Sequence, residues 1–508
     1  MIISLSVLVI TIIVSGTYAL YKAQLSKNIG VNTTTHGLAY YINYVKGTDI
    51  TAATLNPSTS YEGGASSDIE FWKKDDSYDI YGKIELTVNT IGTNLSNSPA
   101  LKYAVVNNGN VLKEGSLKGT TSGSKVTILK NLYLEQTKQI YTVYVWLDNS
   151  EELGNISNES LSISVDCTAS LQKEPTAADT IISLYTSAAK VTATNNSITY
   201  NTAPSVSLMN DRLGGTTTSL DGGNIRYYGA SPNNYIYFNC SDYSNQTSST
   251  CETWRIIGVF DGKLKLIKSE SIGAYSWDNK DTSTGAENDT GKNDWTTARL
   301  MKLLNPSNYY KVDSNDNNLG QSLYYNSASG KCYSGQNNAT VDCDFTSTGI
   351  KNAETRNMIA ETTYNLGGWN SNSVYSNQIY EYERGTTVYT GRPTTWMGKI
   401  ALAYPSDYGY AVDLNKCKYY RVNEYKDTAC VSNNWMKTIL GVSSNGWLLS
   451  THSGGSYDVS FVHLNGSVSN FYLGAQLVYE VAPVLYLSSE LGIELGDGSS
   501  SNPYKLSI

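Results

Sequence analysis

The sequence predicts a multidomain protein with an N-terminal apolar helix, an all-β sandwich and a larger α+β domain. Three observations carry this prediction. The first twenty of the 508 residues are almost wholly apolar. The composition favours strands and turns, with 41 Tyr, 42 Gly and only 16% charged residues. Alternating apolar residues dominate the first third of the chain, whereas two clear helical patterns follow beyond residue 290.

Residues 1–22 are predicted to form a signal anchor or a signal peptide, because twenty apolar residues can cross a bilayer. Two fates fit the segment. It stays as a transmembrane helix, or it is cleaved after Ala19, where small residues occupy the required positions. Lys22 and Lys27 follow the apolar run, and taken alone they oppose an outside C-terminus. We nevertheless expect export to the extracellular face of the membrane, or secretion, because the cysteines agree with it.

Six of the seven cysteines fall into three local pairs, each enclosing a polar loop. The pairs are Cys240 with Cys251, Cys332 with Cys343, and Cys417 with Cys430. Six cysteines allow 15 pairings, but locality favours this one. None has Cys-x-x-Cys spacing, so disulfides are a better interpretation than metal sites, at about 3 kcal/mol of stabilisation each. Three disulfides indicate an oxidising compartment. Cys167 is left over, and we interpret it as a structural thiol.

Residues 23–170 carry the pattern of a β-sandwich. Ile84, Leu86 and Val88 alternate with polar neighbours, and Asn108–Gly109 is typical of a hairpin turn. The segment from Ile140 to Leu147 has bulky residues on both faces, which predicts a central strand.

Residues 171–224 are predicted to contain a short helix, with Pro175 near its start, followed by a linker or a loosely packed surface segment rich in Thr, Ser, Asn and Gly. From residue 225 to the end, a larger α+β domain is expected. Its first hairpin turns at Asp261–Gly262. Helical spacing follows at Trp295–Leu304 and Ala353–Leu366, and strands return in the last third.

Several segments of the C-terminal domain are similar to a domain of unknown function that is common in exported proteins of Gram-positive gut bacteria. They read TWRIIGVFDGKLKLIKSESIGAYSWD, NDWTTARLMKLLNP, ETRNMIAETTYNLGGW, WLLSTHSGG and VAPVLYL. The order of these elements resembles the C-type-lectin-like architecture that formylglycine-generating enzymes share. The resemblance implies that ligands meet loops on one face. It does not import the reactive cysteine pair of those enzymes, because no cysteine follows Cys430.

The sandwich resembles that of secreted biofilm-fibre and camelysin-type proteins, through the segments LKYAVVNNGN and TVYVWLDNSEE. This second resemblance implies a role at the cell surface. Fold alone does not settle function.

Several classes of function lack support in the sequence. The net charge is -8 and the 37 Lys and Arg are scattered, so we expect no nucleic acid partner. No Gly-x-Ser-x-Gly elbow accompanies His452 and His463. Two acidic loops, 278–294 and 313–317, offer oxygen ligands for calcium, but the second does not fit an EF-hand, because it lacks the Gly at the sixth position and has Tyr324 at the twelfth. The sugar-coordinating triplets of calcium-dependent lectins are absent as well. We therefore predict no cofactor, with calcium as the one weak candidate, and no enzyme activity.

The best positive signal is a mixture of aromatic and polar residues near the C-terminus, in or beside the final hairpins. Tyrosine offers a large amphipathic contact area at low entropic cost. The candidate ligand-binding residues are His452, Tyr457, Asp458, His463, Tyr472 and Tyr479. We interpret the chain as a non-catalytic surface protein for ligand binding or adhesion, whose C-terminal loops recognise a glycan or a protein. The alternatives are a structural subunit of a surface layer or fibre, and a hydrolase that uses carboxylates such as Glu381, Glu383 and Asp407.

Overall fold

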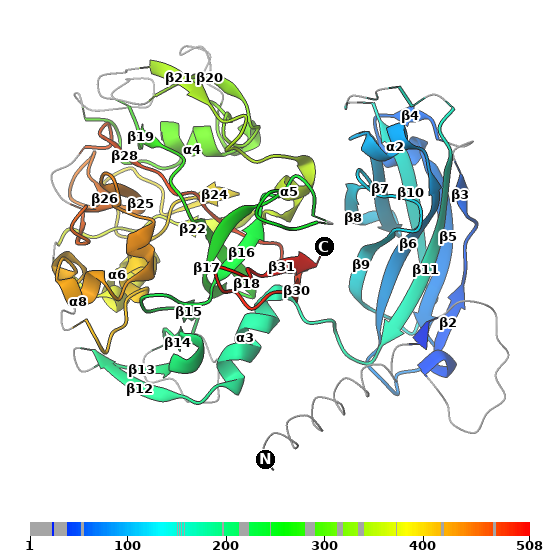
Figure 1. Cartoon of the computed structure of the whole chain (residues 1–508), viewed down its shortest axis with the longest axis horizontal. Helices are drawn as coiled ribbons and strands as arrows, with labels where there is room; N and C mark the ends of the chain where they lie inside the picture. The colour runs from blue at the N-terminus through cyan, green and yellow to red at the C-terminus, as the bar shows by residue number, and fades with distance from the viewer. Residues whose placement is uncertain are drawn as a thin grey trace. The chain divides into compact units, whose positions relative to one another are not determined.

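The computed structural model of the chain is mostly β-sheet and divides into two compact units, Met1–Glu174 and Pro175–Ile508 (Figure 1). It describes residues 23–24, 38–51, 55–149, 151, 153, 155–156, 158–195, 198–212, 223–243, 245–279, 290–311, 319–333, 340–371, 373–417, 421–470 and 474–507. The predicted N-terminal apolar helix lies outside these residues. Within them, the structure contains no helix with the length and apolar character that a membrane span requires.

The first unit consists of two sheets with a shared core. One sheet has the order β1 (Ala23–Gln24), β11 (Leu161–Ser170), β6 (Tyr81–Ile91), β9 (Lys125–Tyr133), with β3 (Ile50–Thr51) beside β11. The other has the order β2 (Ile42–Val45), β5 (Ala65–Lys73), β10 (Ile140–Asp148), β7 (Leu101–Asn107), β8 (Asn110–Ser116), with β4 (Pro57–Ser58) beside β10. Alternate residues of β5 and β6 are buried, as period-two strands require.

Three details of the predicted sandwich are confirmed. Ile84, Leu86 and Val88 are fully buried along β6. Asn108 and Gly109 form the turn between β7 and β8, at φ values of 49° and 77°. Both values lie in the left-handed region, which the Asn-Gly pair tolerates best. β10 is central, pairing with β5 on one side and β7 on the other.

Cys167 lies on β11 inside the sandwich core, with 1% of its surface exposed. Burial raises the pKa of its thiol well above the ordinary value. We therefore expect no thiol of the folded, unreduced protein to react with iodoacetamide. Denaturation without reductant should expose one reactive thiol, detected by mass spectrometry as a single carbamidomethyl group on Cys167. Labelling of the folded protein would contradict this.

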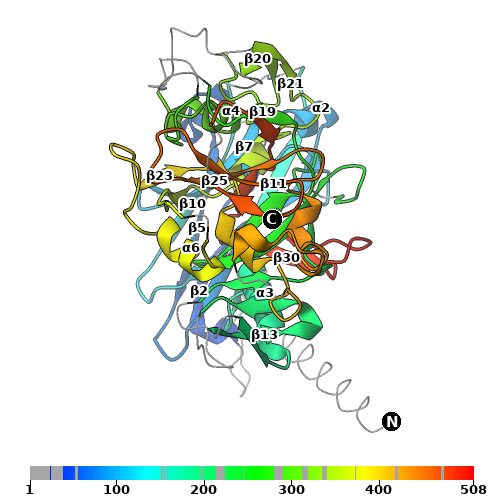
Figure 2. The same cartoon turned by 90° about the vertical axis from the view of Figure 1, so that its left-hand side faces the viewer.

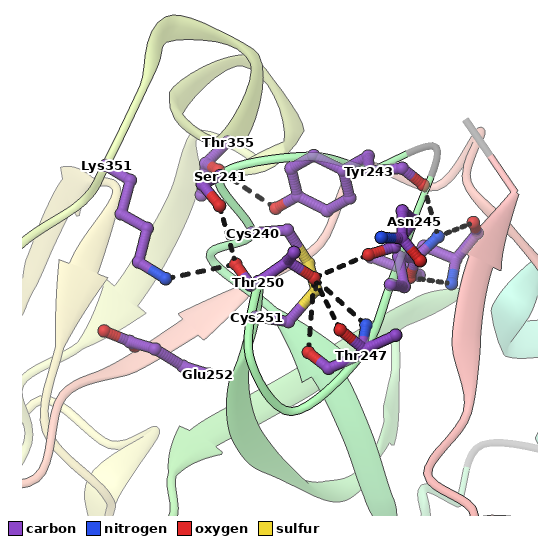
Figure 3. The surroundings of a disulfide bond; sticks show 12 residues. Cys240, Ser241, Tyr243, Asn245, Thr247, Thr250, Cys251, Glu252, Lys351 and Thr355 are labelled. Atoms are coloured by element: carbon purple, nitrogen blue, oxygen red, sulfur yellow. Dashed lines mark hydrogen bonds between the residues drawn. A yellow bond between two sulfur atoms is a disulfide. The ribbon is translucent and has the colours of Figure 1, made fainter.

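The three predicted disulfides are confirmed: Cys240–Cys251, Cys332–Cys343 and Cys417–Cys430. Figure 3 shows the first, which closes a loop that is tied down by its own side chains. The hydroxyl of Thr250 donates to the carbonyl oxygen of Asn245 at 2.5 Å. Lys351 Nζ donates to the carbonyl oxygen of Thr250 at 3.2 Å.

The second unit is built on a large sheet. Its order is β12 (Val191–Asn195), β13 (Ile198–Ala203), β14 (Leu208–Asn210), β15 (Ile225–Tyr227), β17 (Glu252–Phe260), β18 (Lys263–Lys268), β29 (Val484–Tyr486), β24 (Ile400–Ala401), with β16 (Tyr235–Phe238) beside β17. A smaller sheet has the order β19 (Ala274–Ser276), β28 (Val478–Glu480), β25 (Gly446–Thr451), β26 (Val459–Val462), β27 (Val468–Ser469).

Two-stranded ribbons and short helices complete the unit. The ribbons are β20 (Ser329–Tyr333) with β21 (Thr340–Asp344), β22 (Thr362–Asn365) with β23 (Thr395–Gly398), and β30 (Gly492–Leu495) with β31 (Lys505–Ser507). The helices are α3 (Ala177–Ser187), α4 (Arg299–Leu304), α5 (Ala353–Met358), α6 (Ser376–Glu383), α7 (Pro405–Tyr410) and α8 (Thr428–Val431), and α2 (Thr93–Asn97) belongs to the first unit. Figure 2 views the second unit from the side on which α6 lies.

The structure corrects two expectations about these elements. Part of the expected linker, residues 191–210, instead forms β12, β13 and β14 and extends the large sheet. The helix expected over Ala353–Leu366 ends at Met358, and its second half is the strand β22. Thr362, Thr363 and Tyr364 are β-branched or aromatic, so they favour the strand.

Candidate functional site

The residues expected to bind ligand fall into two groups in the structure. His452, Tyr457 and Asp458 lie in the loop that joins β25 to β26. His463 follows β26, at the other end of the same strand pair, and Tyr479 lies on β28 near it. The length of the strand pair therefore lies between the two groups. Tyr472 lies outside the described residues.

The loop group is tightly held. The backbone N–H of His452 donates to the Asp458 carbonyl oxygen at 3.1 Å, and the N–H of Gly454 donates to His452 Nδ1 at 3.1 Å. The side-chain amide of Asn293 donates to the carbonyl oxygens of His452, Gly455 and Asp458. Both His452 and Asp458 are buried. Burial lowers the pKa of His452 below its ordinary value. These contacts fix the loop. The side chains of His452 and Asp458 therefore have little surface exposed to solvent.

The second group is an aromatic cluster that is continuous with the core. The Tyr479 ring lies 4.5 Å from that of Trp447 and 5.3 Å from that of Phe461. His463 lies 4.6 Å from Phe461. Trp447 and Phe461 are fully buried. Tyr479 and His463 therefore pack at the edge of the core.

A cavity of about 160 Å³ lies elsewhere in the second unit, and we call it the Arg384 pocket. Its walls come from the β17–β18 turn, from β22, β29 and α6, and from the residues just before β15 and α7. Its lining residues are Asn224, Phe260, Asp261, Lys263, Thr362, Thr363, Asn365, Tyr380, Arg384, Tyr404 and Tyr486. The lining combines aromatic rings with hydroxyl, amide and charged groups.

The aromatic rings of the lining also contact buried cations. The Arg226 guanidinium lies 4.6 Å from the centre of the Phe260 ring and 5.3 Å from that of Tyr380. Lys265 Nζ lies 4.3 Å from the centre of the Tyr404 ring. Cations attract ring faces at these distances. The buried cations therefore help to hold the rings that form the pocket wall.

The cations belong to a buried ion network below the pocket. Asp407 accepts from Arg226 Nη1 at 2.9 Å and from Lys265 Nζ at 2.5 Å. Asp211 accepts from Arg226 Nε at 2.6 Å. Burial alone would raise the pKa of Asp407, but Lys265 and Arg226 lower it below the ordinary value. Burial lowers the pKa of Lys265. Two cations and two carboxylates thus balance in charge.

A third carboxylate, Glu383, lies at the end of α6 and is fully buried. It accepts from the backbone N–H of Ser406 at 2.9 Å and from the Ser406 hydroxyl at 2.5 Å. Arg384 Nη1 contacts it at 3.3 Å. Burial raises the pKa of Glu383 above its ordinary value. Of the carboxylates considered for a hydrolase, Glu383 and Asp407 are engaged below the lining, and Glu381 is exposed outside it.

The sequence does not predict the Arg384 pocket. Its lining residues are scattered from position 224 to position 486, and no motif joins them. Arg384 and Tyr380 belong to one turn of α6 and its cap, but that spacing is also typical of an ordinary surface helix.

Comparisons with known proteins give no family. No protein-family model matches the chain, and no curated protein matches it. Among solved structures, the chain is similar to a mutant of HCR/D, at 12% identity over 51% of this chain and 76% of that chain, with a TM-score of 0.14. It is also similar to the receptor-binding domain of botulinum neurotoxin mosaic serotype C/D, at 11% identity over 54% and 76%, with a TM-score of 0.15. Scores this low establish no common fold and carry no argument about function.

Proposed function

We propose that this chain is a non-catalytic cell-surface protein that recognises a glycan through the Arg384 pocket. The observation that carries the proposal is the composition of the pocket wall. Tyr380 is partly exposed, so its ring offers an aromatic surface against which a sugar can pack, whereas Tyr404 and Tyr486 contribute buried rings to the wall. Thr362 and Thr363 add hydroxyl groups that can both donate and accept hydrogen bonds. A polyhydroxylated ligand can pair with such polar groups while its ring packs against an aromatic side chain.

The polar groups of the wall are held in place before any ligand binds. Tyr404 donates its hydroxyl to the Asn365 carbonyl oxygen at 2.9 Å and accepts from the Asn365 N–H at 2.8 Å. The Tyr380 hydroxyl accepts from the Asn224 side-chain amide at 2.8 Å. A wall that is already ordered loses little conformational entropy on binding, which favours affinity for a small ligand.

The size of the pocket suits one sugar residue. A cavity needs about 10–15 Å³ to hold one water molecule. The volume of 160 Å³ therefore holds on the order of ten water-sized groups. A ligand of this size would be a terminal sugar or one unit of a longer glycan.

A place outside the cytoplasm fits this role. The three disulfides support an oxidising compartment, and we propose that the apolar N-terminal segment tethers the protein or directs its export. We further propose that the second unit is a C-type-lectin-like domain. A hydrolase has less support, because Asp407 is held between Arg226 and Lys265 and does not line the pocket.

A glycan array with the complete chain tests the proposal. Thr363 is exposed on β22 at the pocket, so Thr363→Tyr should fill the entrance and reduce binding at least tenfold. Thr340, an exposed threonine on β21, provides the matched control, and Thr340→Tyr should bind as the unmodified chain does. The absence of any glycan signal would overturn the proposal in favour of a structural role. If both variants bind the glycan equally well, the Arg384 pocket is not the binding site.

Removal of metal ions should leave glycan binding unchanged. Calcium takes six to eight oxygen ligands, several of them carboxylates, whereas the lining residues that the structure describes include one acid, Asp261. We expect the same affinity in EDTA and in millimolar calcium, measured by calorimetry with a glycan found on the array. A loss of binding in EDTA that calcium restores would contradict this.

A further inference from the structure

We infer that the sugar held in the Arg384 pocket carries a carboxylate group, and that Arg384 binds it. This inference rests on the proposed function and names the chemical class of its ligand. An acidic sugar such as a uronic or sialic acid belongs to this class.

The bonding of Arg384 carries the inference. Its Nη1 donates to the Tyr380 carbonyl oxygen at 3.2 Å and to Glu383 at 3.3 Å. Among the described residues, neither Nε nor Nη2 of Arg384 has a hydrogen-bond partner. These two nitrogens carry the parallel N–H groups of the guanidinium side edge, and a carboxylate accepts from such a pair in bidentate fashion. The side chain is 27% exposed and lines the pocket, so a ligand can reach it.

Arg384 is also held rigidly. Its guanidinium lies 3.5 Å from the centre of the Tyr380 ring and 5.6 Å from that of Tyr404. A stacked, immobilised guanidinium loses little rotamer freedom when it forms a bidentate pair. It therefore suits recognition better than a mobile surface arginine does.

The charges of the lining favour an anion. Among the described residues that line it, Arg384 and Lys263 are the cations, and Asp261, exposed on the β17–β18 turn, is the one acid. Below the lining, Asp407 and Asp211 balance Arg226 and Lys265. Glu383 competes with a ligand carboxylate for Arg384, but it already accepts two hydrogen bonds from Ser406. In the described part of the lining, the cations thus exceed the acids by one.

The remaining lining favours a sugar acid over a peptide C-terminus. Thr362, Thr363 and Asn224 line the same pocket as the cation and have polar side chains. A peptide C-terminus has only its amide groups beside the carboxylate, whereas a sugar acid has several ring hydroxyls that can pair with these polar groups.

Calorimetric titration of the complete chain tests this inference with named probes. They are glucuronate, N-acetylneuraminate, the methyl esters of both acids, glucose, and N-acetyl-alanyl-alanine as a peptide carboxylate. At least one acid should bind, and its ester should bind at least tenfold more weakly. Because the ester comparison needs no variant, it decides the inference even if a variant misfolds.

Variants locate the carboxylate. Arg384→Gln should reduce the affinity for the acid at least tenfold. Arg384→Lys should have an affinity between those of Arg384→Gln and the unmodified chain, because lysine keeps the positive charge but cannot form a bidentate pair. Asp261→Asn should tighten binding by removing the opposing charge. Arg421 is an exposed arginine that lies 5.6 Å from the Tyr375 ring outside the pocket, so Arg421→Gln is the matched control and should change nothing. Near-ultraviolet circular dichroism checks that each variant is folded.

The outcomes separate the two proposals. If an acid and its ester bind equally, or Arg384→Gln binds as well as the unmodified chain while Thr363→Tyr does not, the pocket binds glycans but the carboxylate inference is wrong. Tighter binding of the peptide carboxylate than of either sugar acid would also overturn it. If neither these sugars nor the glycan array give any binding, the proposed function fails as well.

Discussion

Replacing Asp407 by asparagine is expected to lower the free energy of unfolding of the second unit by about 3–5 kcal/mol. Asp407 is 2% exposed and accepts from both Arg226 and Lys265, which are themselves buried. The substitution leaves two cations below the pocket with Asp211 as their remaining carboxylate. Uncompensated charge in a buried site is costly, because neither cation can recover its hydration.

Denaturant-induced unfolding measures the effect, with circular dichroism following the transition of each unit. Asp342 offers a matched control, since it forms an ion pair with Lys331 at 2.6 Å but is 88% exposed. Asp342→Asn should cause no measurable loss, as is usual for exposed ion pairs. Equal stability of the two variants would mean that the network is hydrated and contributes little.

The same substitution should weaken the pocket. Lys265 and Arg226 contact the faces of Phe260, Tyr380 and Tyr404, and these rings form part of the wall. Loss of Asp407 removes the anchor of both cations, so the rings lose a fixed support. Stability and recognition in the second unit therefore depend on one carboxylate.

Local patterns made part of this molecule predictable. The alternation of Ile84, Leu86 and Val88 identified β6, because one face of that strand is buried by the opposing sheet. The three disulfides followed from short separations along the chain. Asn108–Gly109 marked a turn, because few other pairs tolerate two left-handed residues. In each case the determinant lies within a few residues of the feature.

Other features depend on tertiary context. β12 and β13 are polar in sequence and become strands because β13 pairs with β14, whose Leu208 and Met209 are buried. The Arg384 pocket joins segments more than 250 residues apart, so no window of sequence contains it. The predicted ligand-binding residues around His452 are close to one another in the sequence. A strand pair extends by about 3.3 Å per residue, so such nearness can still separate two ends of one hairpin.

The stability of the second unit should also depend on pH through Asp278. This side chain is fully buried, and it accepts from the backbone N–H groups of Lys292 at 2.9 Å and Arg299 at 3.2 Å. Burial raises its pKa to about 7, despite the hydrogen bonds that oppose the shift. An unfolded aspartate titrates near pH 4. Between these values, the folded protein keeps a proton that the unfolded chain has lost.

The sign of the effect follows from proton linkage. Where the unfolded state binds fewer protons, the free energy of unfolding falls as pH rises. The contribution of Asp278 is therefore fully present below about pH 4 and is lost as pH rises through about 7. We expect the second unit to be about 2–3 kcal/mol less stable at pH 7.5 than at pH 5 from this group. Asp278→Asn cannot titrate, so it should flatten the slope even if it lowers stability throughout. Asp342→Asn should leave the slope unchanged, because its exposed carboxyl is not involved. Urea denaturation at steps of half a pH unit from pH 5 to 7.5 measures how the free energy of unfolding of each variant changes with pH. If this free energy changes as steeply in Asp278→Asn as in the unmodified chain, the pH dependence belongs to other groups.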